Sequence, residues 1–281
     1  MPDGHALVLG GGGVAGIAWI TGLLAGLADA GEDVSGADML IGTSAGAAAA
    51  AQLGSGLPLR ELLARQTDPA KQAAEIPAEV DLATLGQEIG GYLAGVTSAR
   101  EYLRRIGAYA LAAQTVPEAA RRAVIESRLP AHEWPARRIV LTAVDAESGE
   151  LRLFDQESGV SIVDAVAASC AVPGIWPPVT IGGRRYVDGG VRSSDNADLA
   201  AGYTRITIVS PLGFDSPLPT PVPLRALVGQ LRADGAEVTV IAPDHASAAA
   251  IGANPLDPST SAPAAQAGLA QGQAGLVAAA S

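Results

Sequence analysis

The sequence predicts an α/β fold in which a mainly parallel central sheet is sandwiched between helices. Short apolar runs at residues 6–9 and 38–41 are each followed by a glycine-containing turn. Helix-forming stretches come next, at residues 16–28 and 44–53. This alternation of strand, turn and helix is typical of parallel strands whose connecting helices cover the sheet. Further strands are expected at 138–144, 151–154, 185–187, 205–209 and 237–241, and further helices at 162–170 and 224–233.

The composition indicates a folded globular chain and excludes several classes of partner. Of the 281 residues, 48% are hydrophobic and 17% are charged, which leaves ample apolar surface for a core. The net charge is −11, from 18 Lys and Arg against 29 Asp and Glu. A nucleic-acid binder needs clustered cations to displace counterions, so no nucleic-acid partner is expected. The same balance argues against strong docking on anionic lipid and leaves a transient contact with a membrane surface.

Neither a metal nor a cofactor is expected. Cys170 is the single cysteine, so an internal disulfide and a cysteine-based zinc site are both excluded. The three histidines, His5, His132 and His245, are too scattered to indicate a metal site.

Two uncharged runs, at residues 6–28 and 39–59, are long enough to cross a bilayer. Both are interrupted by glycines, which indicates a buried strand, a tight loop and a helix rather than a membrane span. The first residues contain no basic stretch typical of a secretory signal, so a cytoplasmic location is expected.

We expect one domain over residues 6–251, with a helical insert at about 57–130 and an Ala- and Gly-rich tail at 252–281. In the insert, the segments that begin at Ser98 and Thr115 fit the capping box, in which a hydroxyl and a carboxylate satisfy free amides at a helix start. The insert helices either pack over the sheet edge or form a mobile lid over a lipid site. The tail either forms a helix or frays.

The segment Gly42-Thr43-Ser44-Ala45-Gly46 is the strongest candidate for chemistry. A nucleophilic serine must stand on a sharp turn between a strand and a helix, and the cramped backbone there requires small residues two positions before and after it. The start of the following helix also favours developing negative charge. The position of the motif after an apolar strand predicts that Ser44 is a nucleophile.

A second glycine-rich segment, residues 10–16, connects the first predicted strand to its helix. Its backbone amides can form an oxyanion hole, or Gly11, Gly13 and Gly16 can form a dinucleotide fingerprint. The fingerprint needs an acidic residue at the end of the second strand, but the nearest, Asp38, lies at the start of that strand. The oxyanion hole is therefore the favoured interpretation.

A third segment, Asp188-Gly189-Gly190, follows a short predicted strand. Taken alone it is typical of a hairpin turn, although a carboxylate there can also stand exposed at a tight turn. A serine nucleophile needs a base, and His245 is the one histidine after Asp188. The order Ser44, acid, His245 would match an α/β-hydrolase triad, but that fold places several strands before its nucleophile.

Taken together and in this order, the three segments resemble the patatin-like phospholipases. The flanking residues 7–13, 167–174 and 186–190 are also similar to that family, and the resemblance covers roughly residues 6–209. It implies a lipid or fatty-acyl ester as substrate and a Ser–Asp dyad without histidine. Ser44 would attack the ester carbonyl, and Asp188 would take its proton.

The resemblance also implies an oxyanion hole made by the amides of Gly11, Gly12 and Gly13, joined by that of Ala45. In one respect the chain departs from the family, which commonly carries Arg or Lys where this chain has Ala15. The alternatives are an esterase that uses His245, a dinucleotide-binding oxidoreductase and a non-catalytic lipid-binding protein.

Overall fold

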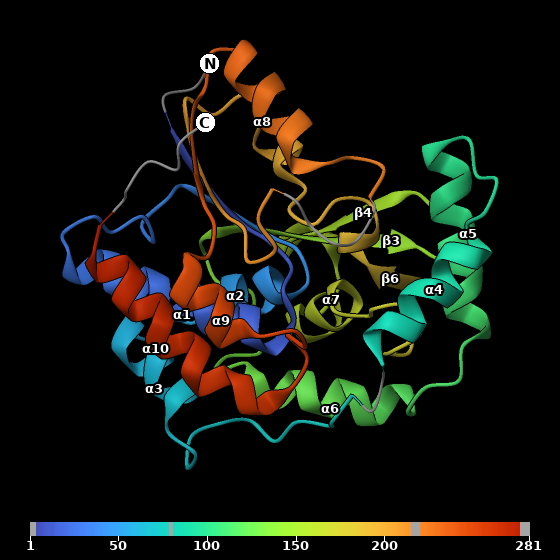
Figure 1. Cartoon of the computed structure of the whole chain (residues 1–281), viewed down its shortest axis with the longest axis horizontal. Coiled ribbons are helices and arrows are strands. Elements are labelled where there is room, and N and C mark those ends of the chain that lie inside the picture. The colour runs from blue at the N-terminus through green and yellow to red at the C-terminus, as the bar shows by residue number, and fades with distance from the viewer. Residues whose placement is uncertain (1–3, 79–80, 215–219, 276–281) are drawn as a thin grey trace.

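The computed structural model describes residues 4–78, 81–214 and 220–275, and its centre is a mixed, mostly parallel sheet between helices (Figure 1). The sheet has the order β5-β6-β3-β2-β1-β7-β8, and β4 also pairs with β3. The parallel strands are β1 (His5–Leu9), β2 (Met39–Gly42), β3 (Arg138–Asp145), β7 (Arg205–Val209) and β8 (Glu237–Ile241). The antiparallel strands are β4 (Leu151–Phe154), β5 (Val179–Ile181) and β6 (Arg184–Asp188).

The predicted α/β class and the predicted strands are confirmed, with bounds that differ by one or two residues. The structure also contains a strand, β5, that the sequence analysis did not predict. It has three residues and lies between a proline pair and a glycine pair, which are typical of a loop. Its pairing with β6 in the antiparallel direction turns this edge of the sheet into a mixed one.

The central strands are buried on both faces, because their alternate side chains enter two different cores. Leu7 and Leu9 of β1 pack among α1 (Gly13–Asp29), α2 (Ala45–Gly54) and α7 (Ile162–Ser169). Ala6 and Val8 face the other way, onto α8 (Leu224–Ala233). In Figure 1, α8 therefore lies on one side of the sheet and α1, α2 and α7 lie on the other.

The predicted tail contains a further helix, α10 (Ser261–Gln273), which packs along α1. Glycines on both helices allow this close approach. A Cβ at Gly22 or Gly26 would overlap the backbone of α10, and one at Gly268 or Gly272 would overlap the backbone of α1. In the sequence, α9 (His245–Ile251) comes between α8 and α10, and it contacts α10.

The described residues of the predicted insert form the helices α3 (Leu59–Thr67), α4 (Leu82–Tyr92), α5 (Ala99–Ala112) and α6 (Glu118–Arg128). Of these, α3 packs on α1, and α6 packs on α7. The hydroxyl half of the capping box at Ser98 is confirmed, because the hydroxyl accepts a hydrogen bond from the Glu101 amide, whereas the Glu101 carboxylate pairs with Arg105. The one predicted at Thr115 is wrong: the extended backbone of Pro117 delays the helix start to Glu118, and the Thr115 hydroxyl donates to the Val116 carbonyl instead.

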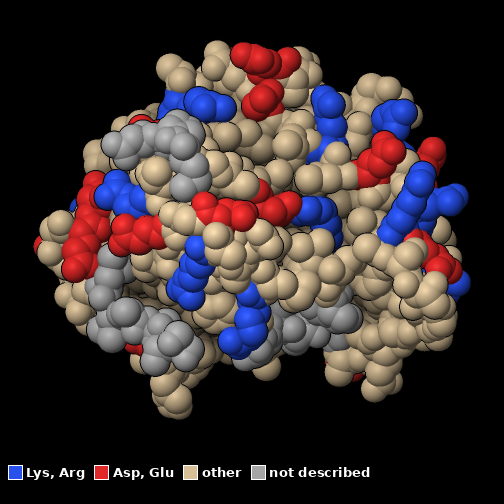
Figure 2. Space-filling view, turned by 90° about the horizontal axis from the view of Figure 1, so that it is seen from above, with Lys and Arg blue, Asp and Glu red and all other residues tan. Residues whose placement is uncertain are grey.

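On the face that carries α8, acidic and basic side chains are interspersed (Figure 2). Among the described residues, no helix combines the length and the apolar character needed to cross a membrane.

Strand register brings the candidate site residues to the same level of the sheet. Gly42, at the end of β2, pairs with Leu141 of β3. The longer strand β3 continues past this point, and its Ala143 pairs with Asp188 at the end of the antiparallel strand β6. The strands β2 and β6 therefore reach this level of the sheet from opposite directions. As a result, Ser44, just after β2, and Asp188, at the end of β6, lie near each other.

Candidate active site

Ser44 occupies a sharp turn between β2 and α2. Its backbone has φ 55° and ψ −115°, a conformation that a residue with a side chain rarely adopts. The glycines on either side make this turn possible. A Cβ at Gly46 would overlap the Leu9 carbonyl, and a Cβ at Gly42 would lie 2.6 Å from the Ala47 Cα. The geometry is that of a nucleophile elbow, with the hydroxyl at the start of a helix.

Asp188, the last residue of β6, lies beside Ser44, close enough for the serine side chain to lower its pKa. Its carboxylate accepts a hydrogen bond of 2.7 Å from the Gly190 amide. Burial raises the pKa of Asp188 to about 7, against the lowering effects of Ser44 and the Gly190 amide. A carboxylate with this pKa is a far stronger base than an exposed aspartate, and it lies next to the serine side chain.

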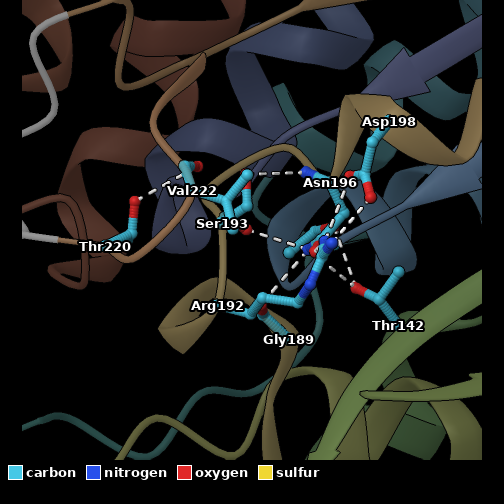
Figure 3. Close-up of polar contacts among 9 residues, drawn as sticks. Thr142, Gly189, Arg192, Ser193, Asn196, Asp198, Thr220 and Val222 are labelled. Carbon is cyan, nitrogen blue, oxygen red and sulfur yellow. Dashed lines mark hydrogen bonds and ion pairs between the residues drawn. The ribbon is translucent and has the colours of Figure 1, made fainter. Parts of the chain in front are cut away.

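Asn196 holds the two sides of the site together, although the sequence analysis did not predict it. It is buried, and its φ of 49° places it in the left-handed region. Its Nδ2 lies 3.1 Å from the Thr43 hydroxyl. It also lies 3.2 Å from the Gly189 carbonyl and 2.8 Å from the Ser193 carbonyl (Figure 3). It therefore links the residue before Ser44 to the residue after Asp188.

Two further residues fix this link. The Thr43 and Thr142 hydroxyls are 2.9 Å apart, which ties the elbow to β3. Arg192 donates to the Asn196 side-chain oxygen at 2.7 Å and forms an ion pair with Asp198 (Figure 3). Because the Asn196 oxygen is held by Arg192, its Nδ2 is directed toward the site.

The glycine loop faces Ser44, but its amides differ in availability. The Gly11 amide donates to the Ser194 carbonyl at 2.9 Å and is therefore engaged. Among the described residues, the Gly12, Gly13 and Ala45 amides have no hydrogen-bond acceptor, as expected at the starts of α1 and α2.

The residues after α7 hold the back of the elbow. The Ser44 amide donates to the Ser169 hydroxyl at 2.9 Å, and the Cys170 thiol donates to the Ser44 carbonyl at 3.2 Å. Burial raises the pKa of Cys170 to about 12, so the thiol is neutral. The segment 167–174 was noted in the sequence for its similarity to the family, and this contact with the elbow is its structural role.

Comparison with known families agrees with this geometry. A sequence model of the family described as "Patatin-like phospholipase" matches residues 7–201. The chain belongs to the patatin-like phospholipase family.

The solved structures that are similar to this patatin-like chain include VipD and ExoU, and no curated protein gives a significant match. VipD from Legionella pneumophila is 14% identical, with a TM-score of 0.47 over 96% of this chain and 66% of its own. The type III effector protein ExoU is 16% identical, with a TM-score of 0.37 over 97% of this chain and 54% of its own. The chain thus spans between half and two thirds of the length of these proteins.

The pocket beside Ser44 in this patatin-like domain is narrow, with a volume of about 20 Å³. Gly13 and Ala45 line it near the nucleophile, whereas Trp176 and Leu256 form apolar walls. The predicted insert contributes polar and apolar groups from two places, Glu75 and Ile76 in the connection from α3 to α4, and Arg121 and Arg128 in α6.

His245 lies elsewhere, exposed at the start of α9. Its neighbour Asp244 caps that helix by accepting from the Ser247 amide. Among the described residues, no hydrogen bond joins His245 to Ser44 or Asp188.

Proposed function

We propose that the protein is a serine lipid acyl hydrolase in which Ser44 and Asp188 form the catalytic dyad. One observation carries this proposal: the Ser44 side chain interacts with a buried carboxyl group, that of Asp188, whose pKa is raised to about 7. A serine needs such a base, and the arrangement lies on a strained turn at a helix start. Membership of the patatin-like phospholipase family supports a lipid acyl ester as the substrate.

In the proposed mechanism, the Ser44 Oγ attacks the ester carbonyl while Asp188 takes the hydroxyl proton. The tetrahedral intermediate then collapses, its C–O bond to the alcohol breaks, and Asp188 returns the proton to the leaving alcohol. Water attacks the acyl-enzyme in the second half of the reaction, and Asp188 again accepts and returns a proton. Ser44 is thereby released together with a free fatty acid.

Backbone amides would stabilise the negative charge on the ester oxygen. Gly12, Gly13 and Ala45 have amides without acceptors, so we assign the oxyanion hole to them. Gly11 was also expected to donate, but its amide is directed to the Ser194 carbonyl. Its role in the proposal is to hold the loop, while Gly12 and Gly13 bind the oxyanion.

The pocket volume of about 20 Å³ leaves room for about one water molecule, so an acyl chain requires that the walls move. The connection from α3 to α4, which carries Ile76, and the loop that carries Leu256 both contribute to this wall. We propose that they separate when the protein makes transient contact with a lipid surface.

The proposal is tested with Ser44→Ala and Asp188→Asn on p-nitrophenyl esters of graded chain length. Each variant is expected to lower kcat by about 10³-fold or more, and a fluorophosphonate probe is expected to label Ser44 of the wild type alone. His245→Ala serves as the control and should retain activity, because His245 is exposed at α9. Loss of activity in the His245 variant would instead favour a triad. Equal turnover in the wild type and both dyad variants would refute the proposal.

A further inference from the structure

Two arginines are buried in the wall of the Ser44 pocket. Arg121 and Arg128 lie seven residues apart on α6, so they share one face of the helix. Their relative exposures are 5% and 6%, although arginine is rarely buried unless its charge is paired. Both line the same pocket as Ser44.

Among the described residues that line the pocket, Glu75 is the one carboxylate that faces this pair. Glu75 accepts from Arg128 through both oxygens, with Nε–Oε1 at 2.6 Å and Nη2–Oε2 at 2.5 Å. The Arg121 Nη1 lies 3.7 Å from Glu75 Oε2, within ion-pair range but too far for a hydrogen bond. Glu75 therefore neutralises Arg128 and leaves Arg121 largely unpaired.

The guanidinium of Arg121 has unused donors. Its Nε and Nη1 are buried without a hydrogen-bond partner, and its carbon lies 3.7 Å from the centre of the Trp176 ring. Burial and the neighbouring charge of Arg128 lower the pKa of Arg121 to about 10, so it still carries its charge at neutral pH.

Apart from Glu75, the described residues that line the pocket include no carboxylate. The Cys170 thiol is neutral because burial raises its pKa. Buried donors and charges without partners are costly, so natural proteins retain them mainly where a ligand completes them.

We propose that Arg121 and Arg128 form a binding site for a phosphate-type oxyanion beside the nucleophile. Two guanidinium groups suit the several oxygens of a phosphate, because each can present parallel N–H donors. In the free protein Glu75 occupies part of this site, and the incoming anion pairs with Arg121 and competes with Glu75 for Arg128. The role of the site in recognising substrate rests on the proposed function, whereas anion binding itself does not.

A second cavity provides the route to this site. It has a volume of about 50 Å³, and Glu75 and Arg128 lie on its wall as well as on that of the Ser44 pocket. Arg65 and Lys71 also line it. An anion that enters here meets positive side chains first and reaches the Glu75–Arg128 pair at the boundary between the two cavities.

Binding is tested with inorganic phosphate and glycerol 3-phosphate by titration calorimetry on the Ser44→Ala protein, so that hydrolysis cannot interfere. In this background, Arg121→Gln should weaken binding by about 10- to 100-fold, and Arg121→Lys should weaken it less. Glu75→Gln should strengthen binding, because it removes the competing charge. The matched control is Arg122→Gln, which removes a charge from the next residue of α6, where Arg122 pairs with Asp164 and Glu126.

A second arm identifies the source of the phosphate. We expect the wild type to prefer a lysophosphatidate over a monoacylglycerol of the same chain length, and Arg121→Gln to reduce the ratio of the two kcat/KM values at least tenfold. An unchanged ratio would assign the site to free phosphate and overturn its role in substrate recognition.

If phosphate binds and this binding depends on Arg121, but no hydrolysis depends on Ser44, the proposed function is refuted while the anion site is supported. Absence of phosphate binding, or equal effects of the Arg121 and Arg122 variants, would overturn the site. Circular dichroism and thermal unfolding confirm that each variant is folded, and Arg121→Lys retains the test if Arg121→Gln does not fold.

Discussion

Asp188→Asn is expected to stabilise the fold at alkaline pH while it abolishes catalysis. The native pKa of Asp188 is about 7, whereas an exposed aspartate titrates near 3.8. Below pH 4 both the native and the unfolded chain carry the proton. Between pH 4 and 7 the unfolded chain loses it first, so the free energy of unfolding falls by about 4 kcal/mol as the pH rises. Asparagine at this position stays neutral throughout and avoids this loss.

Urea denaturation of the wild type and the variant at several pH values measures the effect. Other carboxyl groups titrate alike in both proteins, so the difference between them isolates Asp188. The unfolding free energies should be similar near pH 4, and the variant should be more stable by up to about 4 kcal/mol at pH 8. A difference that does not change with pH would show that Asp188 titrates normally in the native state.

Asp195→Asn is the matched control. Burial also raises the pKa of Asp195 to about 7, against the lowering effect of the Ser210 side chain. This variant should show the same stabilisation at pH 8 but keep its activity. In the wild type, kcat/KM should rise with pH through about 7, because the base must be ionised. A rate that falls over this interval would contradict the assigned role.

Three further experiments test the contacts that position the site and the helices around it. Asn196→Ala removes the link from Thr43 to Gly189, so it should lower kcat about 10- to 100-fold with little change in KM. It should also lower the unfolding free energy by about 2–4 kcal/mol. An unchanged kcat in ester kinetics would contradict this expectation. Gly46→Ala should lower the unfolding free energy by about 3 kcal/mol or more, because the added Cβ overlaps the Leu9 carbonyl. The control is Gly229→Ala on the exposed face of α8, which should raise the unfolding free energy by up to about 1 kcal/mol. The double variant Gly268→Ala, Gly272→Ala should release α10 from α1 and raise the rate of hydrogen exchange in α10. Gln266→Ala, at an exposed position of the same helix, should leave that rate unchanged. Equal exchange rates in the double variant and the Gln266 variant would refute the close packing.

The parts of the fold that local sequence determines were predictable. The strands β1 and β2 are mainly apolar runs that are buried on both faces, and the elbow at Ser44 follows from small residues at fixed spacing. The helix at Ser98 follows from its own capping residues. In these cases the interactions that decide the structure lie within about ten residues of each other.

The remaining parts depend on partners that are distant in the sequence. Asn196 is one of many polar residues in loops, and its importance arises only when Thr43 and Gly189 reach it from other strands. The engagement of the Gly11 amide depends on the Ser194 carbonyl, which no spacing rule relates to the glycine loop. Glu75 and Arg128 resembled ordinary surface charges, and only the packing of the insert places them together.

The residues that carry the proposed chemistry are also those that oppose folding. Ser44 is in a strained backbone conformation, Asp188 is a buried acid, and Arg121 is a buried cation with unused donors. Each is expected to cost about 1–4 kcal/mol. Because the net stability of a domain is of the order of 5–15 kcal/mol, the apolar packing around them must be extensive. The close contact of α10 with α1, directly behind the glycine loop, supplies such packing, and so the chain beyond the family motifs supports the site by stabilising the helix on which its glycine loop ends.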